Sequence, residues 1–582
     1  ERYGYRTLSD ALRSVAGFYT LSDRSYDYVG VRGFLRSGDY NSRILLLVNG
    51  HKINDPLYDM APIGEDFPID IEAIDRIEVV KGPGSSIWGA NALLAVVNVI
   101  TRSVDDAAGG RLGLASDKVF GEYGAEAGEV GIVCSASATR TEGDRRIYFP
   151  EFDAPETNNG IAVGMDDTDA THGYLAADYR NLKLIYCRGT RKKEIPTASY
   201  GTIFNDPRNK LRDSRSVFEL SYESQGVSQN SRSISSRVWC DEYRYIGDYI
   251  YDYPPVTLNR DNYLAKWWGA ELKLYQPIGQ NLSLTCGSEY ARAYDLVEDN
   301  HDVSPYVQYS LRKSTRTAKS LYVQADYRFS DKIALTVGNR YDSFSTFGST
   351  WSPKAALIYV PKDGTHIKAL YGSAFRPPNN YEMSWQDPNL PATQPEKMET
   401  NELVWEQQIG DNSRLVTSLF RYDLRDAITF ESIGDTWRIV NRGSARSSGL
   451  ETQFETRSAN DIRGYVGLSI SKSTFDGARS PASPPYTVTS GVSIPICSHR
   501  YVVSPQLRST GRLLAANGAV AARAATVVDL VASSGRNSNA QITLGIYDLF
   551  GCTAYMPGTA DMIQARVPQS GRTVRLQVSR QF

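Results

Sequence analysis

The residues with the clearest chemical potential lie in a glycine-rich turn, "GPGSSIWGAN" (82–91). Gly84 and Gly89 have the spacing of a phosphate-binding loop, which would need Lys and then Ser or Thr directly after the second glycine. Ala90 stands there instead. The turn therefore does not predict a nucleotide site. Its glycines are better explained by positive φ angles and by close approach of backbone segments in a crowded interior.

Metal ligands are sparse in this chain, which has five His and six Cys. The cysteines are far apart and form no CxxC or Cys/His pair, so we expect buried or lipid-facing thiols. One acidic cluster, "GMDDTDA" (164–170), places Asp166, Asp167 and Asp169 at a spacing that could bind Ca²⁺ in a loop. A solvated acidic loop is the commoner outcome of such a pattern. No triad or carboxylate pair is evident, so we expect no enzyme and no cofactor.

The overall composition excludes several function classes. The 582 residues carry a net charge of −2, so no nucleic-acid partner is expected. No run of 18 apolar residues predicts a transmembrane helix. Tyr outnumbers Phe by 37 to 18, and Tyr suits boundaries between water and apolar surroundings. The mean hydropathy of −0.38 is compatible with a membrane β-barrel, whose lumen-facing half is polar.

From about residue 105 the chain consists of short segments that alternate apolar and polar residues. In "SLYVQADYRF" (320–329), Leu321, Val323 and Ala325 share one face, and Gln324 and Asp326 lie on the other. Tight turns alternate with longer polar loops, which we place at 142–171, 190–214, 248–262, 294–317, 376–397 and 550–571. The pattern predicts a transmembrane β-barrel of about 22 antiparallel strands over residues 105–582. A soluble propeller is disfavoured because nothing repeats at a blade-like period.

Residues 1–104 have a different, mixed texture that predicts a compact α+β domain. "SDALRSVAG" predicts a short helix with Ser9 as its N-cap and Gly17 at its end. "SRILLLVNGHKIND" predicts a strand that turns at Asn49 and Gly50, and "DIEAIDRIEVVKG" predicts a helical turn that leads into another strand.

Two stretches of this N-terminal domain carry a resemblance to a known family. "VRGFLRSGDYNSRILLLVNGHKINDP" (31–56) and "IEAIDRIEVVKGPGSSIWGANALLAVVNVITR" (71–102) closely resemble the plug of TonB-dependent outer-membrane transporters. Weaker likenesses are "AFRPPNNYEM…DPNL" (374–390), "NRGSARSSGLETQFE" (441–455), "GIYDLFG" (545–551) and the terminal Phe582. The resemblance implies that residues 1–104 form a plug inside the lumen of the barrel, in a bacterial outer membrane.

The same resemblance implies a function. Family members import a scarce nutrient, most often a ferric siderophore, with cobalamin and haem as alternatives. The implied partners are TonB with its inner-membrane energising complex, a small-molecule metal chelate and outer-membrane lipid, and we expect a monomer. The TonB box and the first plug strand of the family are missing from residues 1–104, most simply because of disorder or an incomplete sequence. The alternative is a plugged barrel that serves as a surface receptor or scaffold for a protein partner without transport.

The family also implies a lock between plug and barrel. Arg32 and Lys81 match the basic plug residues that pair with barrel glutamates, here Glu402 and Glu451. A charge inside a protein-filled lumen needs a partner, because an unpaired buried charge is costly. Lys81 stands where Arg is commoner and lacks the two-pronged guanidinium. Ordinary lumen salt bridges without a gating role explain these residues equally well.

Ligand contacts in this family come from the plug apices and the long loops. The apices here are 34–41 and 54–64, and "DEYRYIGDYIYDYPP" (241–255) adds many tyrosines. Aromatic and Arg side chains together suit catecholate siderophores through stacking and cation–π contacts, although an aromatic girdle at the membrane boundary is the alternative. The loop "NNYEMSWQ" lacks the His that haem receptors place there. The candidate contacts are Phe34, Arg36, Tyr40, Tyr58, Met60, Tyr249, Tyr251, Tyr381 and Trp385.

Overall fold

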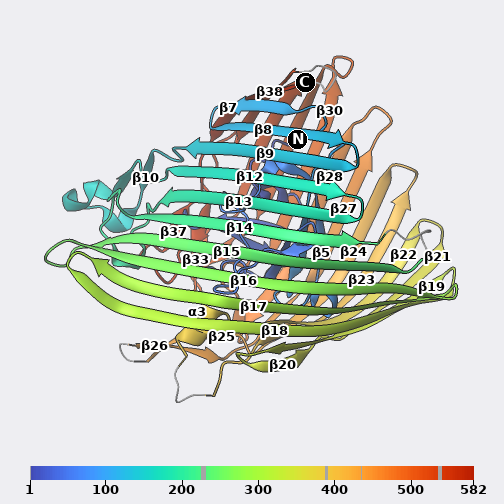
Figure 1. The fold of residues 1–582 in the computed structure, drawn as a ribbon. Coiled ribbons are helices and arrows are strands. Elements are labelled where there is room, and N and C mark those ends of the chain that lie inside the picture. The colour runs from blue at the N-terminus through green and yellow to red at the C-terminus, as the bar shows by residue number, and fades with distance from the viewer. Residues whose placement is uncertain (1, 225–230, 387–390, 434–435, 535–539) are drawn as a thin grey trace.

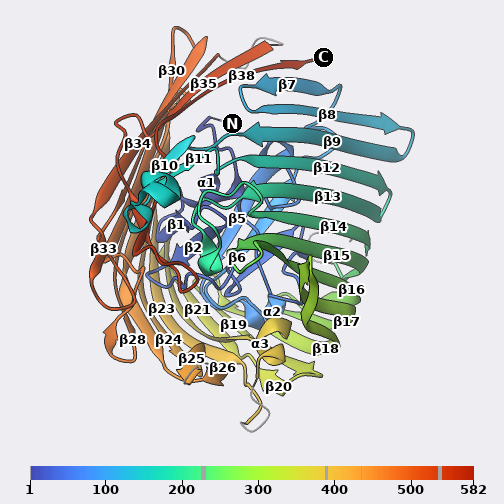
Figure 2. The ribbon, with the colours of Figure 1, turned by 90° about the vertical axis from the view of Figure 1, so that its left-hand side faces the viewer.

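The chain folds into a closed antiparallel barrel with a smaller mixed domain inside it (Figures 1 and 2). A computed structural model describes residues 2–224, 231–386, 391–433, 436–534 and 540–582. No helix within these ranges is long and apolar enough to span a membrane.

The barrel wall consists of 24 strand segments over the described ranges, and β38 closes it against β7. Two segments, β20 (Gly348–Trp351) and β29 (Ala478–Arg479), are short pieces beside β19 and β28, so 22 strands cross the wall. These are β7 (Arg111–Ala115), β8 (Lys118–Ala127), β9 (Val130–Thr141), β12 (Thr168–Tyr179), β13 (Leu182–Glu194), β14 (Lys210–Glu223), β15 (Ser233–Tyr251), β16 (Thr257–Ile278), β17 (Leu282–Val303), β18 (Tyr306–Ser330), β19 (Ile333–Phe344), β21 (Lys354–Lys362), β22 (Thr365–Arg376), β23 (Glu396–Ile409), β24 (Ser413–Arg425), β27 (Ala445–Arg457), β28 (Arg463–Phe475), β30 (Tyr486–Ile496), β31 (Tyr501–Thr510), β34 (Ala525–Ser534), β35 (Ala540–Tyr547) and β38 (Thr573–Gln581).

The two faces of each strand have different surroundings, as the alternating pattern predicts. On β13, Ile185 and Cys187 point inward and are buried, whereas Leu182 and Tyr186 point outward and are about 40% exposed. A closed sheet leaves no unpaired strand edge, so every backbone polar group of the wall can be paired within the apolar layer. The predicted barrel is confirmed.

The strands β15 to β18 are longer than the sequence pattern indicates. Residues 248–262 and 294–317, which we expected to be long loops, are mostly strand, and β17 meets β18 at a turn formed by Ser304 and Pro305. The physical reason is that these strands continue beyond the apolar layer, where polar and apolar residues mix on both faces; the apolar side chains of Val307 and Leu311 are exposed there. Asn300, for example, donates to Asp261 across the strands at 2.5 Å. The alternation of apolar and polar residues ends there, while the backbone ladder continues (Figure 1).

The inner domain, hereafter the plug, lies inside the ring of barrel strands (Figure 2). It contains α1 (Leu8–Leu12), β1 (Phe18–Ser22), β2 (Asp27–Val31), β3 (Ile44–Val48), β4 (His51–Lys52), η1 (Ile71–Ala73), β5 (Ile74–Lys81), α2 (Ser85–Trp88) and β6 (Ala95–Thr101). Its main sheet has the order β4-β3-β6-β5, with β3 and β6 parallel. The fully buried run Ile44–Val48 and the apolar strand β6 form its core.

Two details of the plug differ from or extend the prediction. The helix α1 begins earlier than expected, because the side chain of Thr7, and not of Ser9, accepts the hydrogen bond from the Asp10 N–H. Ser9 is instead buried within the helix. The last plug strand ends at Thr101 and the first barrel strand begins at Arg111, so the predicted domain boundary at residue 104 falls in the connecting segment.

The connections at the two ends of the barrel differ in length. One end has tight turns, such as Arg180 and Asn181 between β12 and β13. The other end carries the longer connections, and by the usual asymmetry of such barrels it faces outside the cell. The longer connections contain α3 (Asn380–Ser384), β10 (Arg146–Tyr148), η2 (Pro150–Phe152), η3 (Pro155–Gly160), β11 (Ile161–Val163), η4 (Ser199–Gly201), β25 (Ile428–Ile433), β26 (Thr436–Asn441), β32 (Leu513–Leu514), β33 (Val520–Ala522), β36 (Tyr555–Pro557) and β37 (Arg566–Pro568).

Candidate functional site

The four residues of the predicted lock meet inside the lumen. Arg32 is 1% exposed, and its guanidinium contacts both carboxylate oxygens of Glu402, at 2.7 Å from Nη2 and 3.0 Å from Nη1. Its Nε donates to Glu451 at 3.2 Å, and Lys81 also forms an ion pair with Glu451. Glu451 on β27 therefore holds two plug cations at once, and Glu402 on β23 receives the two-pronged contact that Arg favours.

Aromatic and glycine residues around the lock explain its geometry. The Tyr422 hydroxyl accepts a hydrogen bond from Arg32 at 2.5 Å, and the Phe420 ring lies 4.6 Å from the guanidinium carbon. Burial opposes the charge of Arg32, but Tyr422, Glu451 and Glu402 outweigh it and raise the pKa of the guanidinium. Gly17 has φ +78, and a Cβ there would lie 2.1 Å from a Glu451 oxygen. Only glycine leaves room for the carboxylate.

The glycine-rich turn packs against the barrel wall. Gly89 has φ +79, and the guanidinium of Arg340 on β19 lies where a Cβ would stand, at 2.8 to 3.0 Å. The Ser85 hydroxyl accepts a hydrogen bond from the Phe375 N–H on β22 at 3.3 Å. Gly82 sits beside Tyr422 and Glu402 of the lock. The turn thus serves close packing between plug and wall, which agrees with the rejection of a phosphate site.

His51 makes a further plug–wall contact that sequence reasoning missed. Its Nδ1 lies 3.1 Å from a Glu219 oxygen on β14, and its Nε2 lies 2.9 Å from an Asp241 oxygen on β15. The ring also meets the edge of Trp239 at 5.6 Å. The sequence indicated only a His at a turn, because nothing local to residues 49–52 shows which strands lie opposite.

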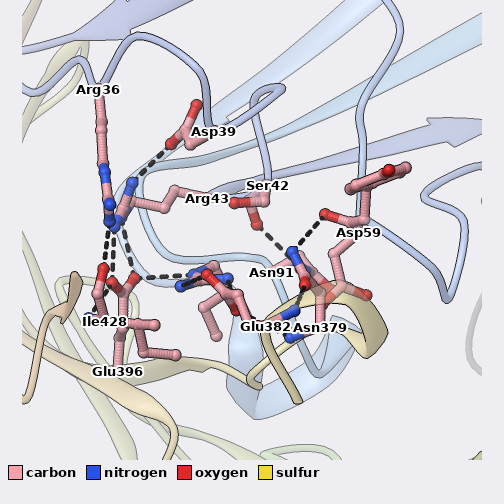
Figure 3. A network of polar contacts seen from close by, with 12 residues as sticks. Arg36, Asp39, Ser42, Arg43, Asp59, Asn91, Asn379, Glu382, Glu396 and Ile428 are labelled. Atoms are coloured by element: carbon pink, nitrogen blue, oxygen red, sulfur yellow. Dashed lines mark hydrogen bonds and ion pairs between the residues drawn. The ribbon is translucent and has the colours of Figure 1, made fainter. Parts of the chain in front are cut away.

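A network of ion pairs joins the plug apex to the outer end of the wall (Figure 3). Arg43 contacts Asp39 at 2.5 Å and Glu396 at 2.6 Å. Glu396 is completely buried and also binds Arg376 at 2.8 Å, which in turn binds Glu382 of α3 at 2.9 Å. Glu396 is therefore the shared anion that links the plug to α3.

An aromatic cluster adjoins this network at α3, where Tyr381 is next to Glu382 in sequence. Tyr58 is its centre, with ring centroids at 5.6 Å from Tyr40, 5.3 Å from Tyr381 and 5.8 Å from Tyr263. Tyr381 is followed by Trp385 at 6.1 Å. Trp385 is 44% exposed, and the Arg312 guanidinium lies 4.9 Å from its ring. The cluster thus runs from the buried plug apex to an exposed, cation-flanked aromatic ring.

The other predicted ligand contacts occupy different surroundings. Phe34 is buried against Tyr422 at 6.3 Å, and Met60 is buried with its sulfur 3.9 Å from Arg215, so neither is open to a ligand. Arg36 donates to the Ile428 carbonyl. Tyr249 is buried and shares a hydrogen bond with Tyr245, and Tyr251 stacks on Tyr253 at 5.2 Å. The sequence indicates these positions by residue type and by their place in the apices and the tyrosine-rich stretch, which does not show how deep each side chain lies.

The predicted calcium cluster does not form a ligand set. Asp166 pairs with Arg24 at 2.8 Å and Lys193 at 2.6 Å, and Asp169 lies among exposed cations. Burial opposes the charged form of Asp166, but Lys193 and Arg24 outweigh it and lower the pKa of the carboxyl. Within the described ranges, no group of three His, Cys, Asp or Glu residues could hold a metal ion. Asp166 acts as an ion-pair partner of the plug.

Comparison with known proteins agrees with this architecture. The family profile described as "TonB dependent receptor-like, beta-barrel" matches residues 139–549, and "TonB-dependent Receptor Plug Domain" matches residues 1–96. The iron-regulated outer membrane virulence protein of Vibrio cholerae serotype O1 is 22% identical over 467 residues. That alignment covers 73% of this chain and 64% of the relative, so the chain spans less than two thirds of the relative's length.

Solved structures share the fold at low identity. The ferric yersiniabactin uptake receptor FyuA of Yersinia pestis has a TM-score of 0.79 at 14% identity, covering 100% of this chain and 96% of its own. The copper transporter OprC has a TM-score of 0.79 at 16% identity, covering 99% and 96%. The chain therefore belongs to the TonB-dependent receptor family, as an outer-membrane β-barrel whose lumen is filled by an N-terminal plug.

Proposed function

We propose that this protein imports a ferric siderophore of the catecholate class across the outer membrane, with energy supplied through TonB. The observation that carries the substrate class is the aromatic cluster around Tyr58, which ends in the exposed Trp385 beneath Arg312. Flat aromatic rings stack on catechol rings, and a cation next to them suits an anionic chelate. The printed names of the iron-regulated relative and of FyuA, a ferric yersiniabactin uptake receptor, support a ferric chelate as substrate; the catecholate class rests on the aromatic cluster.

The ionisation of the cluster favours an intact chelate over a bare metal ion. Burial raises the pKa of Tyr58 well above its usual value, with nearby Tyr263 and Tyr381 adding to the effect. Burial, with Asp261 and Glu298, raises the pKa of Tyr381 to about 12. These phenols therefore stay neutral at physiological pH, and a neutral phenol is a poor ligand for a metal cation. As hydrogen-bond donors and stacking surfaces they suit a metal already wrapped by its chelator.

A route from ligand to plug follows from the network of Figure 3. Tyr381 belongs to the same helix as Glu382, which holds Arg376 and, through Glu396, Arg43 of the plug. A ligand that shifts α3 would shift an ion pair of the plug. The lock at Arg32, Lys81, Glu402 and Glu451 would then hold the plug until TonB pulls on it, which is the gating role that we propose for these residues.

Uptake of radiolabelled iron tests the proposal. Cells that lack the gene would be complemented with the unaltered protein, with Trp385→Ala or with Tyr58→Ala, each with and without TonB. We expect TonB-dependent uptake of a ferric tris-catecholate, with affinity about tenfold lower in either variant because an aromatic contact is lost. Trp385 is exposed, so its substitution spares the fold. Tyr306→Ala, at a 65% exposed tyrosine outside the cluster, is the matched control.

Other substrates give distinct outcomes in the same cells. Uptake of cobalamin, haem or copper in place of the catecholate would replace the proposed substrate while keeping the transport mechanism. Ligand binding without uptake, unchanged by loss of TonB, would contradict transport and favour the receptor or scaffold alternative.

A further inference from the structure

One sector of the outer wall, formed by β12 to β15, is apolar in its lower half and cationic in its upper half. The outward residues of β13 are Leu182, Leu184 and Tyr186, followed by Arg188, Thr190 and Lys192 toward the outer end. A tilted strand needs about nine to eleven residues to cross the apolar layer. Counted from Leu182, that span ends at Thr190 or Lys192. Arg188 therefore lies within the height of the membrane, facing lipid.

The neighbouring strands repeat this division in register. Arg188 pairs with Ser216 on β14, and Arg244 on β15 pairs with Ser214, one outward position higher. Lys192 pairs directly with Arg212. Below them the outward residues are mostly apolar, with Phe218 and Leu220 on β14 and Val238 on β15 exposed. The exception is Glu242, directly below Arg244 on β15, which lies 3.8 Å from Lys266 of β16. Arg188, Lys192, Arg212 and Arg244, hereafter the cationic face, thus lie together above a mostly apolar surface.

Two of these four cations have no protein counter-ion. Arg212 pairs with Asp248 at 2.9 Å, and Lys192 reaches Asp169 only at 3.8 Å. Arg188 and Arg244 are exposed, and across the described part of the chain neither has an ion pair or a hydrogen bond. On the opposite wall, by contrast, the outward Arg421 on β24 pairs with Asp423 at 2.7 Å. A cation that faces lipid without a partner is costly.

The same face is hollowed. An open cavity of ≈ 1320 Å³ is lined by all four cations and by Thr171 and Thr190, whose hydroxyls lie 2.7 Å apart. The carboxylates of Glu142 and Asp169 also line it, and Asp169 lies 3.8 Å from Lys192. It offers guanidinium forks and hydroxyls at its upper part and lies next to the apolar rows below. An amphiphile with an anionic headgroup and acyl chains matches this arrangement of cations above and apolar residues below.

We propose that the cationic face binds the phosphate groups of a phosphorylated lipid in the outer leaflet of the outer membrane. Guanidinium forks fit phosphate oxygens in a two-pronged way, and basic side chains at a membrane surface attract anionic headgroups. The phosphates supply the missing counter-ions of Arg188 and Arg244, and the acyl chains cover the apolar rows beneath. This lipid is a structural ligand of the wall, so the inference is independent of the proposed transport substrate.

Native mass spectrometry of the intact, detergent-solubilised protein tests this. The probe is a bisphosphorylated lipid A, and its dephosphorylated form is the comparison. We expect binding of the phosphorylated form only, weakened roughly fivefold by Arg188→Gln or Arg244→Gln and about thirtyfold by both together. Arg421→Gln, at an outward arginine with an anionic partner, should leave binding unchanged. The heat-dependent shift in gel mobility typical of closed barrels confirms that each variant is folded.

Three results would overturn the proposal. The first is equal binding of the dephosphorylated lipid. The second is unchanged affinity in the folded double variant. The third is displacement of the lipid by millimolar inorganic phosphate, which would make the face a site for free anions and not for a lipid.

Discussion

Raising the pH should loosen the plug, because a protonated His51 bridges two wall carboxylates. Its imidazole is 3% exposed, with Glu219 at 3.1 Å from Nδ1 and Asp241 at 2.9 Å from Nε2. Both ring nitrogens face acceptors, and only the imidazolium can donate from both. Loss of one proton would leave one carboxylate facing a nitrogen lone pair.

The size of the effect follows from the pKa of His51. Burial by itself lowers that pKa, but Asp241 and Glu219 outweigh burial and raise it from 6.5 to about 9. At 1.36 kcal/mol per pKa unit, the shift corresponds to about 3 kcal/mol. Because the pKa is raised in the docked plug, the stabilisation is complete below pH 6.5 and is lost as the pH rises through 9. The reference is the withdrawn plug, in which His51 is hydrated.

Other charged groups near the His51 ring also contribute to the pH dependence of plug docking, and their contributions must be separated from that of His51. Arg237 lies 3.5 Å from Glu219, and Arg215 faces Asp241; both stay charged throughout this range. Burial lowers the pKa of the adjacent Lys52, so loss of the Lys52 proton also changes the stability of plug docking at high pH. The difference between the unaltered protein and His51→Gln at each pH removes these shared contributions.

The assay is the force needed to pull the plug from single barrels, supported by urea titration of plug docking, at pH 6, 7.5 and 9.5. We expect His51→Gln to weaken docking by about 3 kcal/mol at pH 6 and by little at pH 9.5. His366→Gln, on β22 of the wall, is the control and should show no such difference. An unchanged difference at all three pH values, or one that grows with pH, would refute the reasoning.

Two further predictions concern the lock and the plug as a whole. Glu451→Gln removes the anion shared by Arg32 and Lys81 and should weaken plug docking by about 3 kcal/mol in the same pulling assay. The control is Glu406→Gln, at a carboxylate that pairs only with the wall cations Lys368 and Arg414 in the described residues. An unaltered force in Glu451→Gln would argue that these contacts do not hold the plug. Deletion of residues 1–104 should leave a folded barrel that conducts ions in a planar bilayer, because the lumen loses its filling; a barrel that stays closed would contradict the plug assignment.

The wall was predictable because its signal is local. Alternation of period two is a property of each strand by itself, so Leu321 and Gln324 indicate opposite faces without knowledge of any neighbour. The signal failed at 248–262 and 294–317, where strands rise above the membrane and polar and apolar residues mix on both faces. There the ladder is maintained by pairing with neighbours, and no local pattern records that pairing.

The plug contacts were predictable only in part. Arg32, Lys81, Glu402 and Glu451 were found through a family resemblance, and the structure brings them together. His51 and the buried Glu396 have no comparable motif. Phe34 and Met60 illustrate the reverse error, since their residue types suit a ligand site but both are buried.

The sequence alone determined a plugged outer-membrane barrel, because strand alternation and the plug motifs can each be recognised within a short stretch of consecutive residues. The tertiary structure decided which residues face one another across the lumen. Closure of the wall brings Glu219 and Asp241 to opposite sides of one plug histidine, and Glu451 between two plug cations. It also places Arg188 and Arg244 on one lipid-facing surface without counter-ions. These contacts between distant residues depend on strand register and barrel closure, which are properties of the whole sheet and not of any single segment.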